Sequence, residues 1–404
     1  MSFDFISTML RSYKPKIDEL RALYDHLNKV KRALEWQTIV REDNIIPDWS
    51  ARNEVLSALY HSLTKKQMSN DLKETWQKYV LEAGGSRLSS IPILSQYIQR
   101  EGLDDLYQGL SKPAVNLTPL PFCSFFLHFE FTLAKPYISR DDKEFCFHEN
   151  PLRKDTVFKV PVVSPSSWKG NLHWTTMKLL LLDRLEGMSK KEAFEARATL
   201  IRLFGHEKEN GTKKYLDDLF DDKYLEPKHE NTASKQFADF MSRTGYVTKD
   251  GLRQGRLIFY PTFFDQIGLD VINPHDRKTK AGTVPILLEI VPGSKRGQKG
   301  ATGIFSLLYM PFDLIGKSVD DVRQEVQEDL QVTLKTVGAM MLTYGFSAKK
   351  TSGYGVIEPK VEGKLWTNTD KIAPQVKWQI SAEGIFTLDF EDLETLTKKL
   401  EREI

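Results

Sequence analysis

The chain has 404 residues, enough for two or three domains and a sizeable core. Lysine and arginine number 57 against 55 aspartates and glutamates, so the formal net charge of +2 excludes a polycation. Any nucleic-acid binding must therefore come from the local placement of basic residues. Cys123 and Cys146 show neither a disulfide framework nor metal-ligand spacing, which favours a reducing cytoplasm. Residues 1–11 do not resemble a signal peptide, and the apolar run 177–182 is too short to span a bilayer, so we expect no membrane partner.

Residues 1–115 carry apolar stripes at helical spacing. The first stripe runs from Leu20 to Leu34 at alternating spacings of three and four, and two more fall within residues 55–63 and 72–80. We predict three or four helices that pack as a small bundle or appendage. Core packing explains these stripes, and a helix that binds a partner protein is the second interpretation.

A change of pattern marks the start of the main domain. Three prolines within residues 111–121 indicate a linker. Residues 124–133 then predict a strand, with one face formed by Phe125, Leu127, Phe129, Phe131 and Leu133. We therefore place a second domain at residues 122–404.

The rest of the second domain alternates strands and helices. We predict strands near residues 157–163, 256–260, 285–291, 305–310 and 354–357, with further β structure within 377–390. Helices are predicted at 172–185 and, from a long apolar stripe, at 319–341, where Gly345 is a plausible left-handed cap. Residues 207–224 are polar and predict an exposed loop within an insertion at about 205–255. This order is typical of an α+β, ferredoxin-like domain.

Two loops beside helices carry residues suited to phosphate. The first is Ser166-Ser167-Trp168-Lys169-Gly170, directly before an apolar helix. Ser166 or Ser167 suits a helix N-cap, where free N–H groups and the helix dipole attract anions. Lys169 adds a charge, and Gly170 permits close approach of the backbone. An ordinary capped helix with a surface lysine is the alternative interpretation.

The second loop spans residues 345–355 and is the denser of the two. It holds three glycines, two lysines and three hydroxyl residues (Ser347, Thr351 and Ser352) in eleven positions. Backbone N–H groups, hydroxyls and ammonium groups can together grip a phosphodiester backbone. The loop matches neither a Walker nor a dinucleotide-binding fingerprint. A surface turn without a ligand is the alternative interpretation.

These two elements, in this order and context, resemble the RAMP superfamily of CRISPR-associated proteins, and most closely the backbone subunits of type III effector complexes. Other stretches support the likeness: 149–155 with 160–163, Leu203-Phe204-Gly205, 273–280 and 289–293. The likeness runs from about residue 122 to 360. The resemblance implies a ferredoxin-like RNA-recognition core and a thumb hairpin at about 265–285, and it leaves the N-terminal helices unexplained.

The resemblance also implies partners and contacts. The partners are a guide RNA, a complementary target RNA and other CRISPR effector subunits, joined in an antiviral ribonucleoprotein. The thumb would wedge into the guide–target duplex. The expected RNA-binding residues are Arg153, Lys154, Ser166, Ser167, Lys169, Arg277, Lys349, Lys350, Thr351, Ser352 and Tyr354.

Catalysis depends on one acidic position. In the family's active backbone subunits an Asp stands where this chain has Glu149, and an Asp there could orient the attacking 2′-hydroxyl or hold a cation such as Mg2+. A shift of about 1 Å can cost about 10²-fold in rate, so the longer Glu149 favours a chiefly structural subunit with no firmly bound cofactor. Asp141, Asp142 and His148 are nearby fallback candidates.

Three alternatives remain to this structural interpretation. One is a metal-dependent endoribonuclease that cuts target RNA with Glu149. A second is a guide-processing ribonuclease of the same superfamily. The third, from a different class, is a helical adaptor whose β domain binds no RNA.

Overall fold

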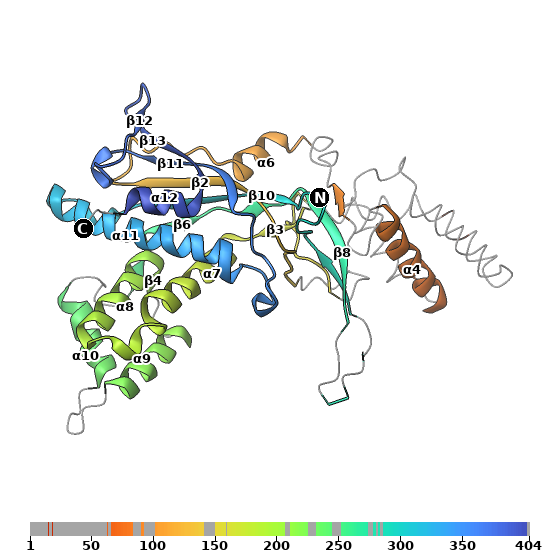
Figure 1. The fold of residues 1–404 in the computed structure, drawn as a ribbon, viewed down its shortest axis with the longest axis horizontal. Helices are drawn as coiled ribbons and strands as arrows, with labels where there is room; N and C mark the ends of the chain where they lie inside the picture. The colour runs from red at the N-terminus through yellow and green to blue at the C-terminus, as the bar shows by residue number, and fades with distance from the viewer. Residues whose placement is uncertain are drawn as a thin grey trace.

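The computed structural model describes residues 66–83, 90–92, 102–140, 150–158, 160–206, 211–224, 232–244, 252–273 and 286–401, and the separate residues Pro15, Asp18, Leu63, Lys278, Thr279 and Gly282. In these parts of the chain, helices cover one face of an antiparallel sheet (Figure 1). The predicted α+β class is confirmed. None of the described helices is long and apolar enough to cross a membrane.

The main sheet has six strands in the order β12-β13-β11-β2-β10-β6. Their bounds are β12 Gln379–Ile380, β13 Phe386–Asp392, β11 Lys360–Thr367, β2 Phe125–Thr132, β10 Thr302–Tyr309 and β6 Leu257–Phe259. Strand β2 lies in the middle, antiparallel to both β10 and β11. Its predicted apolar face is buried, because alternate side chains of a strand point to the same side.

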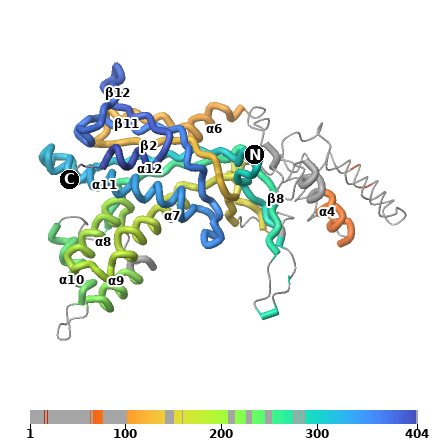
Figure 2. Tube along the Cα trace, viewed as in Figure 1, coloured from red at the N-terminus to blue at the C-terminus, as the bar shows by residue number. Residues whose placement is uncertain are grey.

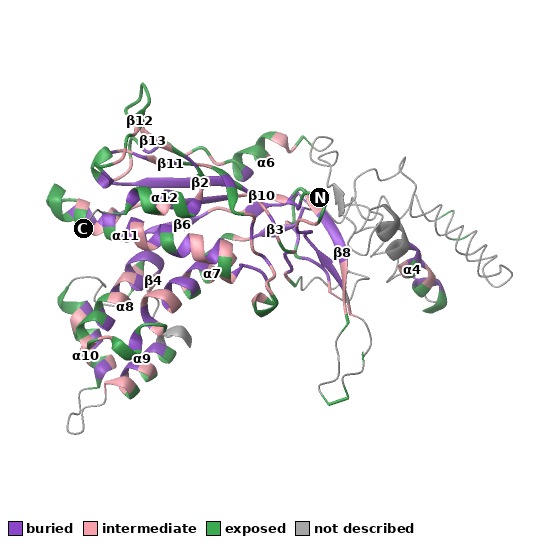
Figure 3. Cartoon of the chain, in the orientation of Figure 1, coloured by how far each residue is buried: buried purple, intermediate pink, exposed green. Residues whose placement is uncertain are grey.

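Two long helices and a short one pack on this buried face. They are α7 (Pro165–Met177), α11 (Val319–Ala339) and α12 (Leu393–Leu400). A π-helical turn extends α7 over Lys178–Leu182, and another extends α11 over Met340–Tyr344. Figure 2 shows that α7, from the middle of the chain, lies beside the late segment that contains α11. The buried residues follow the inner faces of sheet and helices (Figure 3).

The insertion between α7 and β6 is helical. It contains α8 (Lys190–Phe204), α9 (Gly211–Lys223) and α10 (Ala233–Arg243). The predicted exposed loop at 207–224 is therefore wrong over α9. Leu216 and Phe220 recur at helical spacing and are buried, and the Phe220 ring stacks 5.9 Å from that of Phe194. The polar residues of this stretch belong to the outer face of an amphipathic helix.

A β-hairpin that belongs to a separate, three-stranded sheet lies at the predicted thumb position (Figure 1). Strand β8 (Gln266–Ile272) pairs with β9 (Ile286–Ile290), and β1 (Ser90–Pro92) pairs with the other edge of β8. Two further strand pairs are β3 (Val162–Val163) with β7 (Thr262–Phe263) and β4 (Gly205–His206) with β5 (Arg253–Gln254). In the N-terminal region the described helices are α4 (Lys66–Ala83) and α6 (Asp104–Ser111), and the other helices predicted there lie outside the described residues.

Two predicted strands differ from the structure. Residues 354–357 make a single bridge, Ile357 to Leu133, and the strand that follows is β11. Of residues 157–163, Val162–Val163 are strand, and a turn held by the Asp155 carboxylate occupies 156–158. An Asp that accepts from N–H groups two and three residues later favours a turn over an extended strand.

A buried ionic network joins the insertion to the sheet and α11. Arg256, fully buried on the approach to β6, donates from Nη1 to Asp329 of α11 at 2.8 Å. Arg202 of α8 donates to the other oxygen of Asp329 at 2.7 Å, and the Tyr309 hydroxyl of β10 donates at 2.6 Å. Burial raises the pKa of Tyr309 well above its usual value, and the charge of Asp329 adds to this rise. The phenol therefore stays protonated and keeps donating to the carboxylate.

Removing this carboxylate should destabilise the fold. We expect Asp329→Ala to lower the free energy of unfolding by about 3 kcal/mol, because two buried guanidinium groups lose a shared partner. The matched control is Glu328→Ala at the preceding, exposed position, where we expect the free energy of unfolding to change by no more than about 0.5 kcal/mol. Urea denaturation measures both variants, and equal midpoints would contradict the role given to Asp329.

Candidate nucleic-acid interface

The first candidate loop, the 164–170 segment, is the first turns of α7. The N-cap is Ser164, whose hydroxyl accepts from the N–H of Ser167 at 3.3 Å, with proline at the first helical position. The predicted caps Ser166 and Ser167 are instead first-turn residues, and both hydroxyls hydrogen-bond to Ser164 at 2.9 and 3.0 Å. The Ser-Pro pair was the missed signal, because Pro suits the position directly after an N-cap.

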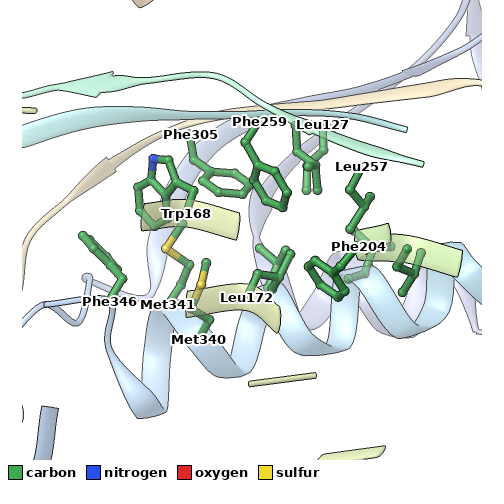
Figure 4. Close-up of a cluster of buried hydrophobic side chains, with 14 of the residues drawn as sticks. Leu127, Trp168, Leu172, Phe204, Leu257, Phe259, Phe305, Met340, Met341 and Phe346 are labelled. Atoms are coloured by element: carbon green, nitrogen blue, oxygen red, sulfur yellow. The ribbon is translucent and has the colours of Figure 1, made fainter. Parts of the chain in front are cut away.

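Trp168 fixes the start of α7 against the sheet. Its side chain is fully buried, and its indole N–H donates to the Thr262 hydroxyl at 3.0 Å. Its ring lies 5.0 Å from that of Phe305 in β10 and 4.5 Å from that of Phe346, as the cluster in Figure 4 shows. Because Trp168 points inward, its neighbours Ser166, Lys169 and Gly170 lie on the exposed side of the helix.

The 345–355 loop turns sharply at glycines. Gly345 has φ 74° and Gly355 φ 73°, where side chains are strained. An added Cβ would meet the carbonyl oxygen of Tyr354 at Gly345 and the Cβ of Ser347 at Gly355. The predicted left-handed cap at Gly345 is correct in the sign of φ, but ψ is 163°, so the backbone leaves the helix extended. The two ends of the loop thus touch each other.

Side chains of this loop bind it to two neighbouring segments. The buried Ser347 hydroxyl accepts from the N–H of Ile138 at 2.8 Å and donates to its carbonyl at 3.0 Å. The Tyr354 hydroxyl donates to Asp270 of β8 at 3.1 Å. Burial raises the pKa of Tyr354, and the Asp270 charge adds to the rise, so the phenol keeps its proton. Tyr354 therefore anchors the loop to the hairpin, a role other than the predicted RNA contact.

The two loops meet, although about 175 residues separate them in sequence. Asn171 of α7 donates from its amide to the carbonyl of Phe346 at 3.2 Å and to that of Ser167 at 2.9 Å. The Phe346 ring lies against Trp168. Exposed groups of both loops therefore share one surface, and these are Ser166, Lys169, Lys349, Thr351 and Ser352.

Two side chains at this junction were missed from the sequence. Asn171 bridges the seam, by which we mean the contact line between α7 and the 345–355 loop. Trp174 lies exposed beyond Asn171, with the Lys350 ammonium 4.8 Å from its ring centroid. Ser167, Asn171 and Trp174 recur at spacings of four and three, the signal of one helix face.

Arg153 and Lys154, two further residues predicted to contact RNA, differ in burial. Arg153 is exposed, and its backbone N–H donates to the Ser139 hydroxyl at 3.3 Å. Lys154 is buried and pairs with the equally buried Glu289 of β9 at 2.6 Å. An ammonium held in a buried ion pair does not face the surface, so this geometry gives no support to the predicted contact of Lys154 with RNA.

Glu149, Arg277, Asp141, Asp142 and His148 lie outside the described residues. In the described part of the chain no group of three or more His, Cys, Asp or Glu side chains is arranged to hold a metal ion.

A family model covers the part of the chain that holds both loops. The model of the RAMP superfamily matches residues 134–358, more than half of the chain. This chain belongs to the RAMP superfamily. The match includes both candidate loops and the hairpin, and it confirms the family named from the sequence.

Solved structures similar to this RAMP protein come from CRISPR complexes. A type III-B Cmr-beta complex bound to cognate target RNA contains a chain with 14% identity and a TM-score of 0.34, over 89% of this chain and 98% of that chain. A chain of the Csm3-Csm4 subcomplex of the type III-A CRISPR-Cas interference complex has 13% identity and a TM-score of 0.31, over 71% and 97%. A chain of a CRISPR RNA-guided surveillance complex has 13% identity and a TM-score of 0.33, over 61% of this chain and 70% of that chain. No curated protein matches the chain.

The hydroxyl of Ser347 should hold the 345–355 loop closed. Ser347→Ala leaves the buried N–H of Ile138 without its acceptor, so we expect a loss of about 1–3 kcal/mol and faster amide exchange at residues 136–140 and 345–355. Ser352→Ala, an exposed hydroxyl in the same loop, is the control and should leave exchange unchanged. Hydrogen–deuterium exchange compares them, and identical exchange in the two variants would refute the clamp.

Proposed function

We propose that this chain is an RNA-binding subunit of a type III CRISPR effector complex, which grips the backbone of a guide RNA and presents the target. The observation that supports this most is the contact between the 164–170 segment and the 345–355 loop. It gathers two exposed lysines, four exposed or half-exposed serines and a threonine on one surface. Membership of the RAMP superfamily supports the same function.

The chemistry of this surface suits phosphate and not base edges. Ammonium groups, hydroxyls and free N–H groups contact phosphates of any sequence. A guide RNA varies in sequence from one spacer to the next, so a subunit that holds it needs contacts of this kind. The net charge of +2 is compatible with such binding because the charge is local.

Gly170 indicates that the surface is open. It lies within α7, and a Cβ added there would meet nothing within 4 Å. Alanine is favoured over glycine by about 1 kcal/mol at an exposed helical position, and packing gives no reason for the glycine here. Close approach of a ligand backbone provides one.

The loop also has a fixed position relative to the hairpin. Tyr354 bonds to Asp270 near the outer end of β8, and Ile138, held by Ser347, packs in one apolar cluster with Leu288 and Ile290 of β9. An RNA strand bound on the loop would therefore pass beside the hairpin. This geometry supports a role of the hairpin in separating guide from target.

The direct test is to identify the bound RNA. We would purify the chain together with the products of its neighbouring genes and sequence the RNA that accompanies it. Short RNAs that share a repeat-derived 5′ tag are the expected result. No RNA, or only a mixture of cellular RNAs, would refute guide binding and favour the helical adaptor.

The lysines should contribute through charge. We expect Lys169→Ala and Lys349→Ala each to reduce the slope of log affinity against log salt by about 0.7, because each removes one cation from a single-stranded backbone. Lys214→Ala, an exposed lysine on α9 of the insertion, is the control and should leave the slope unchanged. Filter binding across a salt series measures all three. Wild-type slopes for Lys169→Ala and Lys349→Ala would exclude this surface as the phosphate site.

A further inference from the structure

Trp174 is an unusual surface residue. It is 37% exposed, and among the tryptophans whose side chains the structure describes it is the one classed as exposed. The other tryptophan of α7, Trp168, is fully buried. Part of the Trp174 ring therefore remains accessible to a molecule outside the chain.

One ammonium group and one aromatic ring contact Trp174. The Lys350 ammonium lies 4.8 Å from its ring centroid, and the Tyr344 ring stands nearly perpendicular at 5.4 Å. Lys178, one turn further along the same helix face, has its ammonium 5.9 Å from the Tyr344 ring. Trp174 and Lys178 come from the C-terminal end of α7 and its π-helical extension, Tyr344 from the end of the extension of α11, and Lys350 from the 345–355 loop.

The position along α7 relates Trp174 to the phosphate surface. Seven residues separate it from Ser167, about 10 Å along the helix axis. A stacked strand rises about 3.4 Å per nucleotide, so this distance corresponds to about three nucleotides. One RNA strand can therefore contact the start of α7 with its phosphates and Trp174 with a base.

We propose that Trp174 is a stacking platform for an unpaired RNA base, which displaces the Lys350 ammonium from the ring so that Lys350 pairs with a phosphate. This inference rests on the proposed RNA-binding function and adds to it a site for a base. Stacking needs only a flat π face, so the site accepts bases of any sequence.

Both contacts that form in this exchange, the base on Trp174 and the phosphate on Lys350, are stronger than the contact between Lys350 and the ring. An ammonium over an exposed ring is worth about two- to fivefold in affinity, and a base stacked on an aromatic side chain about 5- to 150-fold. Burial lowers the pKa of Lys350, which means that its charge is partly deprived of water where it lies. A phosphate would compensate that charge better than the ring does.

The test uses the full chain, a short labelled single-stranded RNA and an abasic strand of the same length. Trp174→Ala should weaken binding of the RNA about 5- to 150-fold without a change in salt slope, and binding of the abasic strand should stay as in wild type. Trp174→Phe should restore part of the affinity. Lys350→Gln should reduce the salt slope by about 0.7. The control is Tyr215→Ala, which removes an exposed aromatic side chain on α9, away from α7 in sequence. Thermal unfolding checks that each variant is folded.

The outcomes separate this inference from the proposed function. If the wild-type chain binds neither strand, RNA binding itself fails and the base site with it. If Lys169→Ala reduces the salt slope but Trp174→Ala binds RNA like wild type, the phosphate surface stands and the stacking site is refuted. An equal loss on RNA and abasic strand would refute base stacking as well. An unchanged slope for Lys350→Gln would refute the transfer of Lys350 to a phosphate.

Discussion

The contact between Trp168 and Phe346 is the constraint on which the candidate interface depends. Both rings are buried, Trp168 against Phe305 of β10 and Phe346 against Phe131 of β2, and each lies in a segment that also exposes polar side chains. The two loops are held together by the hydrophobic core, and no polar bond between their exposed groups is needed. Their order is therefore established on folding, so little conformational entropy remains to be lost when a ligand binds. A preformed surface of this kind suits a ligand that is recognised by shape and charge alone.

Charge in this chain serves two purposes that the sequence does not distinguish. Arg202 and Arg256 lie in the core with carboxylates, and Lys154 pairs with Glu289 under the hairpin. Lys169 and Lys349 are exposed, and they lie on the surface that both loops share. A basic residue contributes to binding a polyanion only where it is not already neutralised by a buried partner. Burial therefore removes Lys154, Arg202 and Arg256 from any contact with a polyanion and leaves Lys169 and Lys349 available for one.

The structural elements that could be predicted from the sequence are those whose signal lies in neighbouring residues. Strand β2 was found because strict alternation of Phe and Leu leaves no other structure with one buried face. The 345–355 loop was found because glycines, lysines and hydroxyls lie close together in sequence. The missed parts depend on distant partners. Lys154 has no local sign of Glu289, which lies 135 residues later. The apolar positions of helix α9 lie among many charged residues, and its buried Phe220 packs against Phe194 and Phe237 from neighbouring helices.

Strand β11 shows a further reason why a strand can be missed from the sequence. Val361, Leu365 and Thr367 alternate inward, but Gly363 interrupts the apolar face, and charged residues occupy the outward positions. The glycine has a tertiary cause, because a Cβ there would collide with the ring of Phe390 and the side chain of Phe129. A residue that weakens the local strand signal thus permits close packing in the sheet.

The seam between α7 and the 345–355 loop has two chemically different ends. At the start of α7 it offers hydroxyls and an ammonium group, and two turns later it offers aromatic rings. Contacts to phosphate and stacking on a π face share one property, because neither depends on which base is present. A seam with both can fix the path of a strand and the direction of a base while leaving the pairing edges free. That separation of holding from reading is what a subunit needs if a guide of arbitrary sequence is to select the target.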